Sequence, residues 1–200
     1  MPKIVDHNER REHIAKIVAE LMSTVGVENT TIREISRQSG YSRGFIEHYF
    51  QDKEELVAAA LNWINEQSLQ RAQTKLQDSK GLAALRVLGE ITLPISEESQ
   101  KEWRVRLQYW GMAAVHPEHK KEQSRRMNVV EKMFLNHLRE AQEMGEIPKK
   151  IDVAPLAQDL LHRMYGLSCV AILRPSHFTK QRQLEAIDYI FSEMLKSIGK

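Results

Sequence analysis

Residues Thr30–Lys53 read TTIREISRQSGYSRGFIEHYFQDK, and this stretch decides the fold of the N-terminal part of the chain. The pattern predicts a short helix, a tight turn at Gly40, a second short helix capped by Ser42, and a stop. This layout is typical of a helix-turn-helix, whose second helix enters the DNA major groove. The helical patterns that follow are too extensive for a protein that consists only of a DNA-binding domain. We therefore expect a DNA-binding head that carries a larger, sensing body.

The packing of such a motif depends on a few side chains. Ile32 and Ile35 on the first helix of the motif should pack against Ile46 on its second helix. Ser39 and Tyr41 depart from the small or branched apolar residues expected at their positions. Both are accommodated if Tyr41 lies over the first helix of the motif.

The charge of the head is only weakly positive. Thr31–Lys53 contains four basic and three acidic side chains, a net charge of +1, and the whole chain has a net charge of +2. Net charge alone therefore does not indicate nucleic-acid binding. Affinity for DNA must come from where the cations lie, or from doubling of the head by dimerisation.

Several features of the composition indicate a cytoplasmic protein with no membrane contact. The single cysteine, Cys169, excludes an intrachain disulfide and fits a reducing compartment, and we expect it to be a small core residue rather than a redox sensor. The N-terminal stretch MPKIVDHNERRE has no apolar core for a signal peptide. The apolar run Gly166–Leu173 is far too short to span a bilayer.

Helical spacing recurs along the chain, whereas alternating strand patterns are scarce. Apolar residues from Ile14 to Val25 form one stripe, and Gly26 is expected to stop that helix. A further helix is predicted over residues 53–76, and body helices near 81–93, 97–115, 118–145, 153–173 and 180–198. The fold class is therefore all-α. Nine helices are expected, with a three-helix head in residues 8–54 and a ligand-sensing and dimerisation body in residues 55–200.

Three segments carry a resemblance to a known family: Thr31-Ile-Arg-Glu-Ile35, Ser39-Gly-Tyr-Ser-Arg-Gly-Phe-Ile46 and His48-Tyr-Phe-Gln-Asp-Lys-Glu-Glu-Leu56. They resemble the TetR family of transcriptional repressors. Gly44–Lys53 is similar to the choline-responsive betaine-synthesis repressor branch. The resemblance implies a homodimer on operator DNA that responds to a small-molecule effector. No cofactor is implied.

The first residues of the second motif helix are the candidates for reading bases. Ser42, Arg43 and Gly44 open this recognition helix, whose N-terminal residues meet base edges. Arg43 is expected to bind guanine O6 and N7, and Gly44 lets the backbone approach closely. Phe45 either touches thymine methyl groups or packs within the head. Glu47 either accepts from cytosine N4 or points back into the head.

Four other residues are the candidates for phosphate contacts. The resemblance implies that Tyr49 contacts phosphate, and His48 is a neighbouring candidate. Lys53 begins the helix over 53–76, and its charge can act together with that helix's N-terminal amides on one phosphate. Thr31 can do the same at the first motif helix. For each residue the alternative is a solvated surface side chain.

The last two predicted helices carry more apolar residues than one core-facing stripe requires. Their apolar positions run from Val153 to Ile172 and from Leu184 to Ile198. The excess indicates a partner surface, and the resemblance makes that partner a second copy in a four-helix bundle. The alternative is a pair of helices buried inside one chain.

An aromatic group is the candidate ligand pocket. Trp103, Leu107 and Trp110 fall at i, i+4 and i+7 of one helix. Such aromatics can form part of a cage for a quaternary ammonium through cation–π attraction, and Trp63, Phe134 and Tyr165 would complete it. Core packing of the same rings is the alternative. Resemblance to the choline-responsive branch implies a choline-like effector, and an unrelated apolar or cationic molecule is equally compatible.

Motifs of enzymes and metal sites are not convincing here. Glycine-rich phosphate loops are missing, and the single cysteine has no evident catalytic neighbour. His116-Pro-Glu-His119 has metal-binding residue types, but Pro117 marks a helix break, so a solvated loop is predicted and no metal site. The basic pairs Lys120-Lys121, Arg125-Arg126 and Lys149-Lys150 lie near glutamates and predict solvated helix faces.

The sequence as a whole favours a ligand-responsive regulator that binds a palindromic operator and is released by its effector. The helix over 53–76 joins head and body, and is the expected lever between them. Two other functions fit the pattern. One is a DNA-binding architectural module without a sensor. The other is an all-helical small-molecule binding protein without specific DNA recognition.

Overall fold

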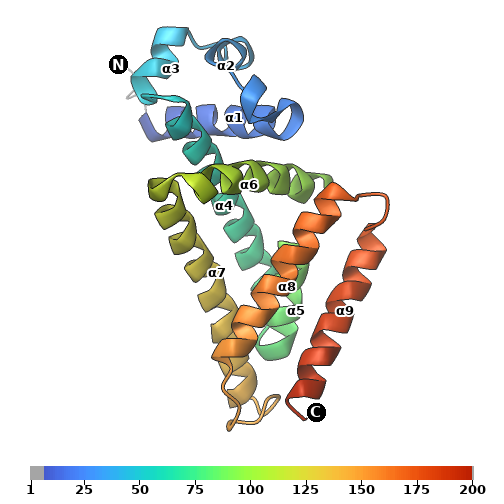
Figure 1. Ribbon diagram of the computed structural model, residues 1–200. Helices are drawn as coiled ribbons and strands as arrows, with labels where there is room; N and C mark the ends of the chain where they lie inside the picture. Colours follow the sequence, from blue (N-terminus) through green and yellow to red (C-terminus); the bar gives the residue numbers. More distant parts are fainter. Residues whose placement is uncertain (1–6, 200) are drawn as a thin grey trace.

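The computed structural model describes residues 7–199, which fold into nine α-helices without a β-strand, so the all-α prediction is confirmed. Residues 1–6, part of the stretch on which the signal-peptide prediction was based, lie outside the described residues. The helices are α1 (His7–Asn29), α2 (Ile32–Ser39), α3 (Arg43–Tyr49), α4 (Lys53–Leu76), α5 (Gly81–Thr92), α6 (Glu97–Val115), α7 (Pro117–Glu143), α8 (Ala154–Leu173) and α9 (Lys180–Ser197) (Figure 1).

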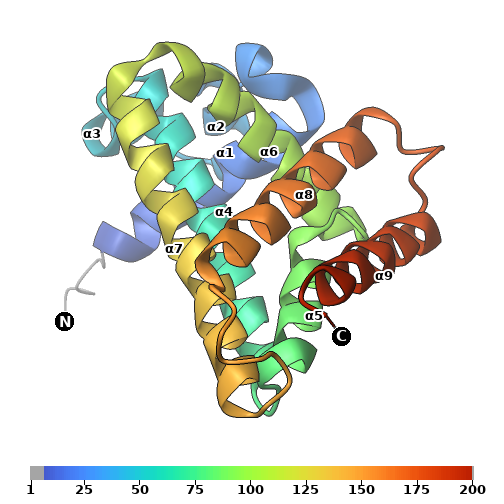
Figure 2. The ribbon, with the colours of Figure 1, turned by 60° about the horizontal axis from the view of Figure 1, so that its bottom comes forward.

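The arrangement separates a small head from a longer body. In Figure 1, α1, α2 and α3 form the upper end, α6 crosses beneath them, and α4 and α7 run away from the head. Helices α8 and α9 lie side by side on one flank of the body in both ribbon views (Figure 2). Within the described residues, none of these helices is long and apolar enough to cross a membrane.

Local sequence explains where the helices begin. The side-chain oxygens of Thr31, Ser42 and Asp52 each accept a hydrogen bond from the backbone N–H three residues later, at the starts of α2, α3 and α4. Proline at the first position of α7 lacks the N–H that a helix start leaves unpaired, so Pro117 begins this helix.

Gly26 bends α1, because its φ of 83° and ψ of 162° are non-helical. The predicted break therefore occurs there, although one more turn continues to Asn29. Gln108 of α6 satisfies backbone groups on both sides of the bend: its Nε2 donates to Met22 O (3.0 Å) and its Oε1 accepts from Val27 N (2.5 Å). The bend is thus held by a body helix.

Two hydrophobic cores stabilise the chain. The head core joins Ile14, Val18, Ile35 and Ile46 to the first half of α4 and to Val105 of α6, among others. The body core lies between α5, α7, α8 and α9, away from the head. The predicted domain boundary after residue 54 falls at the start of α4, and the head core extends across it into α4 and α6.

Candidate DNA-binding face and effector cavity

The two motif helices have the packing that the sequence predicts. Ile35 and Ile46 are buried, and Ile32 is half-buried against the same core. Gly40 turns the chain with a φ of 72°, in the left-handed region that glycine tolerates best. Tyr41 is half-buried against the head core. Its hydroxyl accepts from Arg10 Nη1 of α1 (3.1 Å), and its ring lies beside that of Phe45.

Six of the eight candidate DNA contacts are exposed: Thr31, Ser42, Arg43, Gly44, His48 and Lys53. The other two, Phe45 and Tyr49, are half-buried. Tyr41, Phe45 and Tyr49 stack along one side of α3, with ring centroids 4.6 and 5.0 Å apart. Of the two roles expected for Phe45, the structure therefore accounts for packing within the head.

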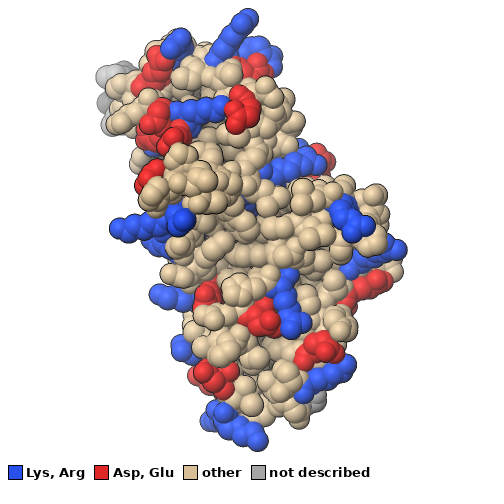
Figure 3. Space-filling model, viewed as in Figure 1, with Lys and Arg blue, Asp and Glu red and all other residues tan. Residues whose placement is uncertain are grey.

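Charged side chains on the recognition helix are paired with each other. Arg43 Nε donates to Glu47 Oε1 at 2.8 Å, one helical turn away. Glu47 therefore stays at the surface rather than pointing into the head. Lys53 Nζ donates to Glu28 O at 3.3 Å. On the face shown in Figure 3, basic and acidic side chains are interspersed over the head, in keeping with its weak net charge.

A cavity of about 320 Å³ lies in the body, among α4, α5, α6, α7 and α8. Its volume is at the lower end of the range of about 300–1,000 Å³ for small-molecule sites. Four of the predicted pocket residues line it: Trp103, Trp110, Phe134 and Tyr165.

The other two predicted pocket residues do not line this cavity. Trp63 lies on α4 but packs against the head core. Leu107 lies on α6 and is half-buried, while its neighbour Arg106 faces the cavity with Trp103 and Trp110. The face of α6 that lines the cavity therefore has residues at i, i+3 and i+7, one of them an arginine.

The arginine side chains on the cavity wall are the main feature that the sequence pattern did not predict. Arg125 is exposed as predicted, but only 13% of the Arg126 side chain is exposed, so the expected solvated face is wrong for Arg126. Arg126 lies one turn before Val130 and two turns before Phe134, on the buried stripe of α7. Its position on that stripe was the signal available in the sequence.

The aromatic part of the wall is closely packed. Trp103 is buried and donates its indole N–H to Thr92 O. Trp103, Trp110 and Tyr165 meet edge to face, with centroids 5.3 to 5.8 Å apart. Burial raises the pKa of Tyr165 to about 12, so its hydroxyl stays protonated at neutral pH and can donate a hydrogen bond.

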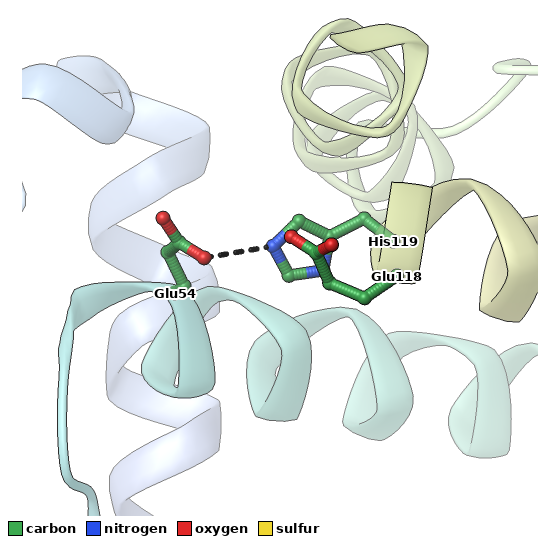
Figure 4. A group of neighbouring side chains, drawn as sticks. All are labelled: Glu54, Glu118 and His119. Atoms are coloured by element: carbon green, nitrogen blue, oxygen red, sulfur yellow. Dashed lines mark hydrogen bonds and ion pairs between the residues drawn. The ribbon is translucent and has the colours of Figure 1, made fainter. Parts of the chain in front are cut away.

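A group of three side chains connects α7 to the start of α4 (Figure 4). His119 Nε2 lies 3.1 Å from Glu54 Oε2, and ligand atoms of Glu54, Glu118 and His119 all lie within 4.8 Å of one another. Exposed carboxylates often gather in this way without a metal ion. The predicted solvated loop is wrong here, because Pro117 starts α7 and the His119 side chain is only 12% exposed.

The outer face of α8 and α9 carries apolar side chains in contact with solvent. Val170, Leu173 and Tyr189 are 39%, 74% and 63% exposed. Cys169 of the same region is half-buried rather than fully buried, and burial raises the pKa of its thiol. A raised thiol pKa makes the reactive thiolate scarcer at neutral pH.

Known proteins share both parts of this chain. Residues 18–60 match the model of the bacterial regulatory proteins of the TetR family, and residues 81–196 match that of the C-terminal domain of BetI-type transcriptional repressors. The regulator PksA of Bacillus subtilis is 31% identical over 127 residues, which cover 61% of this chain and 58% of PksA. The regulator BetI of Pseudomonas fluorescens is 30% identical over 122 residues, 59% of this chain and 61% of BetI. The matched segments thus span about three fifths of these relatives.

Solved structures have the same fold at lower sequence identity. A regulator from Rhodococcus has a TM-score of 0.80 at 21% identity, covering 94% of this chain and 96% of its own. A regulator from Saccharomonospora viridis in complex with choline has a TM-score of 0.79 at 20% identity, covering 93% of this chain and 97% of its own. The relatives are named as regulators rather than enzymes. With more than half of its length matched by one family model, the chain belongs to the TetR family and has a body of the BetI type.

Proposed function

We propose that this protein is a ligand-responsive transcriptional repressor. A homodimer binds a palindromic operator through α3 of each copy, and a small molecule in the body cavity releases it. Membership of the family, the exposed face around Arg43 and the cavity of about 320 Å³ support this proposal. Because a repressor acts where the DNA that it regulates is transcribed, we infer that the protein acts in the cytoplasm.

The observation that carries the proposal is the continuity of α4. The helix begins at Lys53, among the candidate phosphate contacts, and lines the cavity from Leu61 to Ala72. His119 ties the cavity-lining helix α7 to Glu54 at the same end of α4. A ligand that favours one position of α4 or α7 would therefore favour one position of the head. Only such differential binding can change DNA affinity.

Dimerisation supplies what a single head lacks. One recognition helix covers few base pairs, and a two-fold dimer reads two half-sites about 34–36 Å apart. The exposed apolar residues Val170, Leu173 and Tyr189 make α8 and α9 the proposed interface, a four-helix bundle with the second copy.

The test is a fluorescence-anisotropy titration with the DNA upstream of the protein's own gene and with random DNA of equal length. We expect tighter binding of the upstream DNA, and a ligand that occupies the cavity should weaken it about 5- to 150-fold. Equal affinity for both DNAs would favour an architectural module. No DNA binding at all would favour a small-molecule binding protein.

Choline is the first ligand to test, because the Saccharomonospora viridis regulator was solved with choline and Trp103, Trp110 and Tyr165 gather at one cavity wall. A ligand proved by calorimetry to occupy the cavity, but without effect on operator affinity, would contradict the proposed mechanism. The charge of the cavity wall, however, supports a different ligand class.

A further inference from the structure

We propose that the effector is an organic anion, a carboxylate with a compact apolar body, whose carboxylate binds at the Arg106 and Arg126 end of the cavity. This inference rests on the proposed role of the cavity as the effector site. It is carried by the distribution of charge and apolar side chains along the cavity wall, by the incomplete pairing of the two arginines, and by the packing of the aromatic rings.

The cavity has a polar end toward the head and an apolar end away from it. Helices α4 and α7 both run away from the head (Figure 1). Along α4 the lining residues change from Asn62 and Asn65 to Leu69 and Ala72. Along α7 they change from Gln123, Arg125 and Arg126 to Val130, Met133 and Phe134. An amphiphilic ligand therefore has one favoured orientation, with its polar group toward the head.

The charged part of this wall is mainly cationic. Three arginines line the cavity, Arg106, Arg125 and Arg126, against one carboxylate, Glu66. Glu66 is exposed to solvent, whereas only 16% and 13% of the Arg106 and Arg126 side chains are exposed. Glu102 and Glu122 lie behind this wall as partners of Arg106 and Arg126, and each is shared with a second arginine. The preference for an anion therefore rests on the guanidinium nitrogens that these carboxylates leave without a close partner.

Arg106 is held in place but incompletely paired. Its Nη2 donates to Ser68 Oγ at 2.6 Å, whereas its Nη1 lies 3.7 Å from Glu102 Oε2, beyond hydrogen-bonding distance. Glu102 makes a closer ion pair with Arg71, at 2.5 Å. Burial lowers the pKa of the Arg106 guanidinium more than Glu102 restores it. A ligand carboxylate would supply the missing counter-charge.

Arg126 also has unused hydrogen-bonding capacity. Its Nη2 binds Asn62 Oδ1 (2.5 Å) and Glu122 Oε1 (3.1 Å). Its Nη1 is buried without a hydrogen-bond partner, and so is Oε1 of Gln123 one turn earlier. An unpaired buried donor is costly, and most costly when it is charged. An anion with a hydroxyl or amide group would pair with both residues.

The aromatic rings are poorly arranged for a quaternary ammonium. The Arg106 guanidinium already lies over the Trp103 ring, 5.5 Å from its centroid, so this ring has an internal cation. Trp110 and Tyr165 pack edge to face on Trp103 and on each other. A choline-like ligand would have to enter beside Arg106 and would be repelled by it.

Three ligands of similar shape test the charge directly: phenylbutanoate, its neutral amide phenylbutanamide, and phenylpropyl-trimethylammonium. Phenylacetate, octanoate and choline extend the series. Affinities are measured on the full-length protein by calorimetry and by tryptophan fluorescence. We expect at least one carboxylate to bind, its amide to bind about tenfold or more weakly, and the cations to bind more weakly still.

Variants then locate the carboxylate. Arg106→Gln and Arg126→Gln should each weaken carboxylate binding about 10- to 100-fold and leave amide binding almost unchanged. Arg139→Gln is the matched control, because Arg139 lies on α7, is exposed and does not line the cavity. Thermal unfolding checks that each variant is folded. The lysine variant at the same position, which keeps the charge but loses the bidentate guanidinium fork, replaces a glutamine variant that does not fold, and it should also weaken carboxylate binding.

The outcomes separate this inference from the proposed function. Three results would overturn the inference. The cations bind as tightly as the carboxylates, the carboxylate affinity is unchanged by both substitutions, or no carboxylate in the series binds. The proposed function would survive if choline still released the operator. Conversely, carboxylate binding that depends on Arg106 but leaves operator affinity unchanged would support an anion site at the two arginines, and would contradict both the proposed function and the role of that anion as effector.

Discussion

Arg43 on the recognition helix is the residue with the sharpest expected effect on sequence preference. Glu47 occupies its Nε, so both terminal nitrogens remain to meet guanine O6 and N7, and the ion pair orients the side chain. Arg43→Ala should lose about 1–3 kcal/mol on the operator and much less on random DNA. Anisotropy titrations with both DNAs measure the ratio. Equal losses on the two DNAs would refute base reading by Arg43.

Lys53 should act on all DNA sequences alike, because we propose that it contacts a phosphate rather than a base edge. Lys53→Ala should weaken operator and random DNA equally and flatten the salt dependence by about one unit per head. Lys75→Ala is the control, since Lys75 is exposed at the other end of α4. Titrations over a range of salt concentrations give the slopes. A slope unchanged by Lys53→Ala would remove this residue from the phosphate contacts.

The cavity residues show what single-residue patterns can and cannot predict. Four of six predicted pocket side chains line the cavity, because aromatics at helical spacing lie on one face. Trp63 was wrongly placed, since α4 packs against the head on one side and the body on the other, and periodicity does not tell two apolar faces apart. The burial of Arg126 is not predicted by its charge, which usually indicates a solvated side chain, but its position continues the buried stripe of α7.

The helices themselves follow closely from local signals. The prediction for residues 53–76 matches α4 (Lys53–Leu76), because Asp52 caps it, and the body helices differ from their predicted bounds by a few residues. Tertiary contacts explain the differences. Tyr41 turns toward Arg10 on α1, which is distant in sequence, and His119 is covered by Tyr109 of α6 and Glu54 of α4.

Gly26 should be intolerant of any side chain, because its backbone lies in a region that only glycine adopts readily. Gly26→Ala should lower the free energy of unfolding by about 1–3 kcal/mol. Gly111→Ala is the matched control: Gly111 is helical, with nothing near its Cβ position, and alanine there should be neutral or stabilising by up to about 1 kcal/mol. Urea unfolding measures both. Similar effects of the two substitutions would contradict strain at Gly26.

Head and body are joined by more than the chain connection at α4. Gln108 of α6 binds backbone groups on both sides of the Gly26 bend, and Arg106, two residues earlier, lines the cavity. Helices α4 and α6 therefore each contact both the cavity and the head core. A ligand that shifts either helix acts on the head without crossing a flexible linker, which favours coupling through rigid elements.

The proposed dimer is the largest structure that the function requires, and a single substitution tests its interface. Leu173→Glu would place one carboxylate from each copy in the proposed apolar interface of α8 and α9. Burying these charges there is unfavourable. We expect the dimer dissociation constant to rise at least about tenfold, and operator affinity to fall with it. Val115→Glu is the matched control, because Val115 is also 74% exposed but ends α6, away from α8 and α9. Sedimentation velocity over a concentration series measures the assembly, with circular dichroism to verify helix content. If Leu173→Glu stays dimeric while Val115→Glu dissociates, the interface lies elsewhere on the molecule, and the spacing of the two heads must be derived again from that surface.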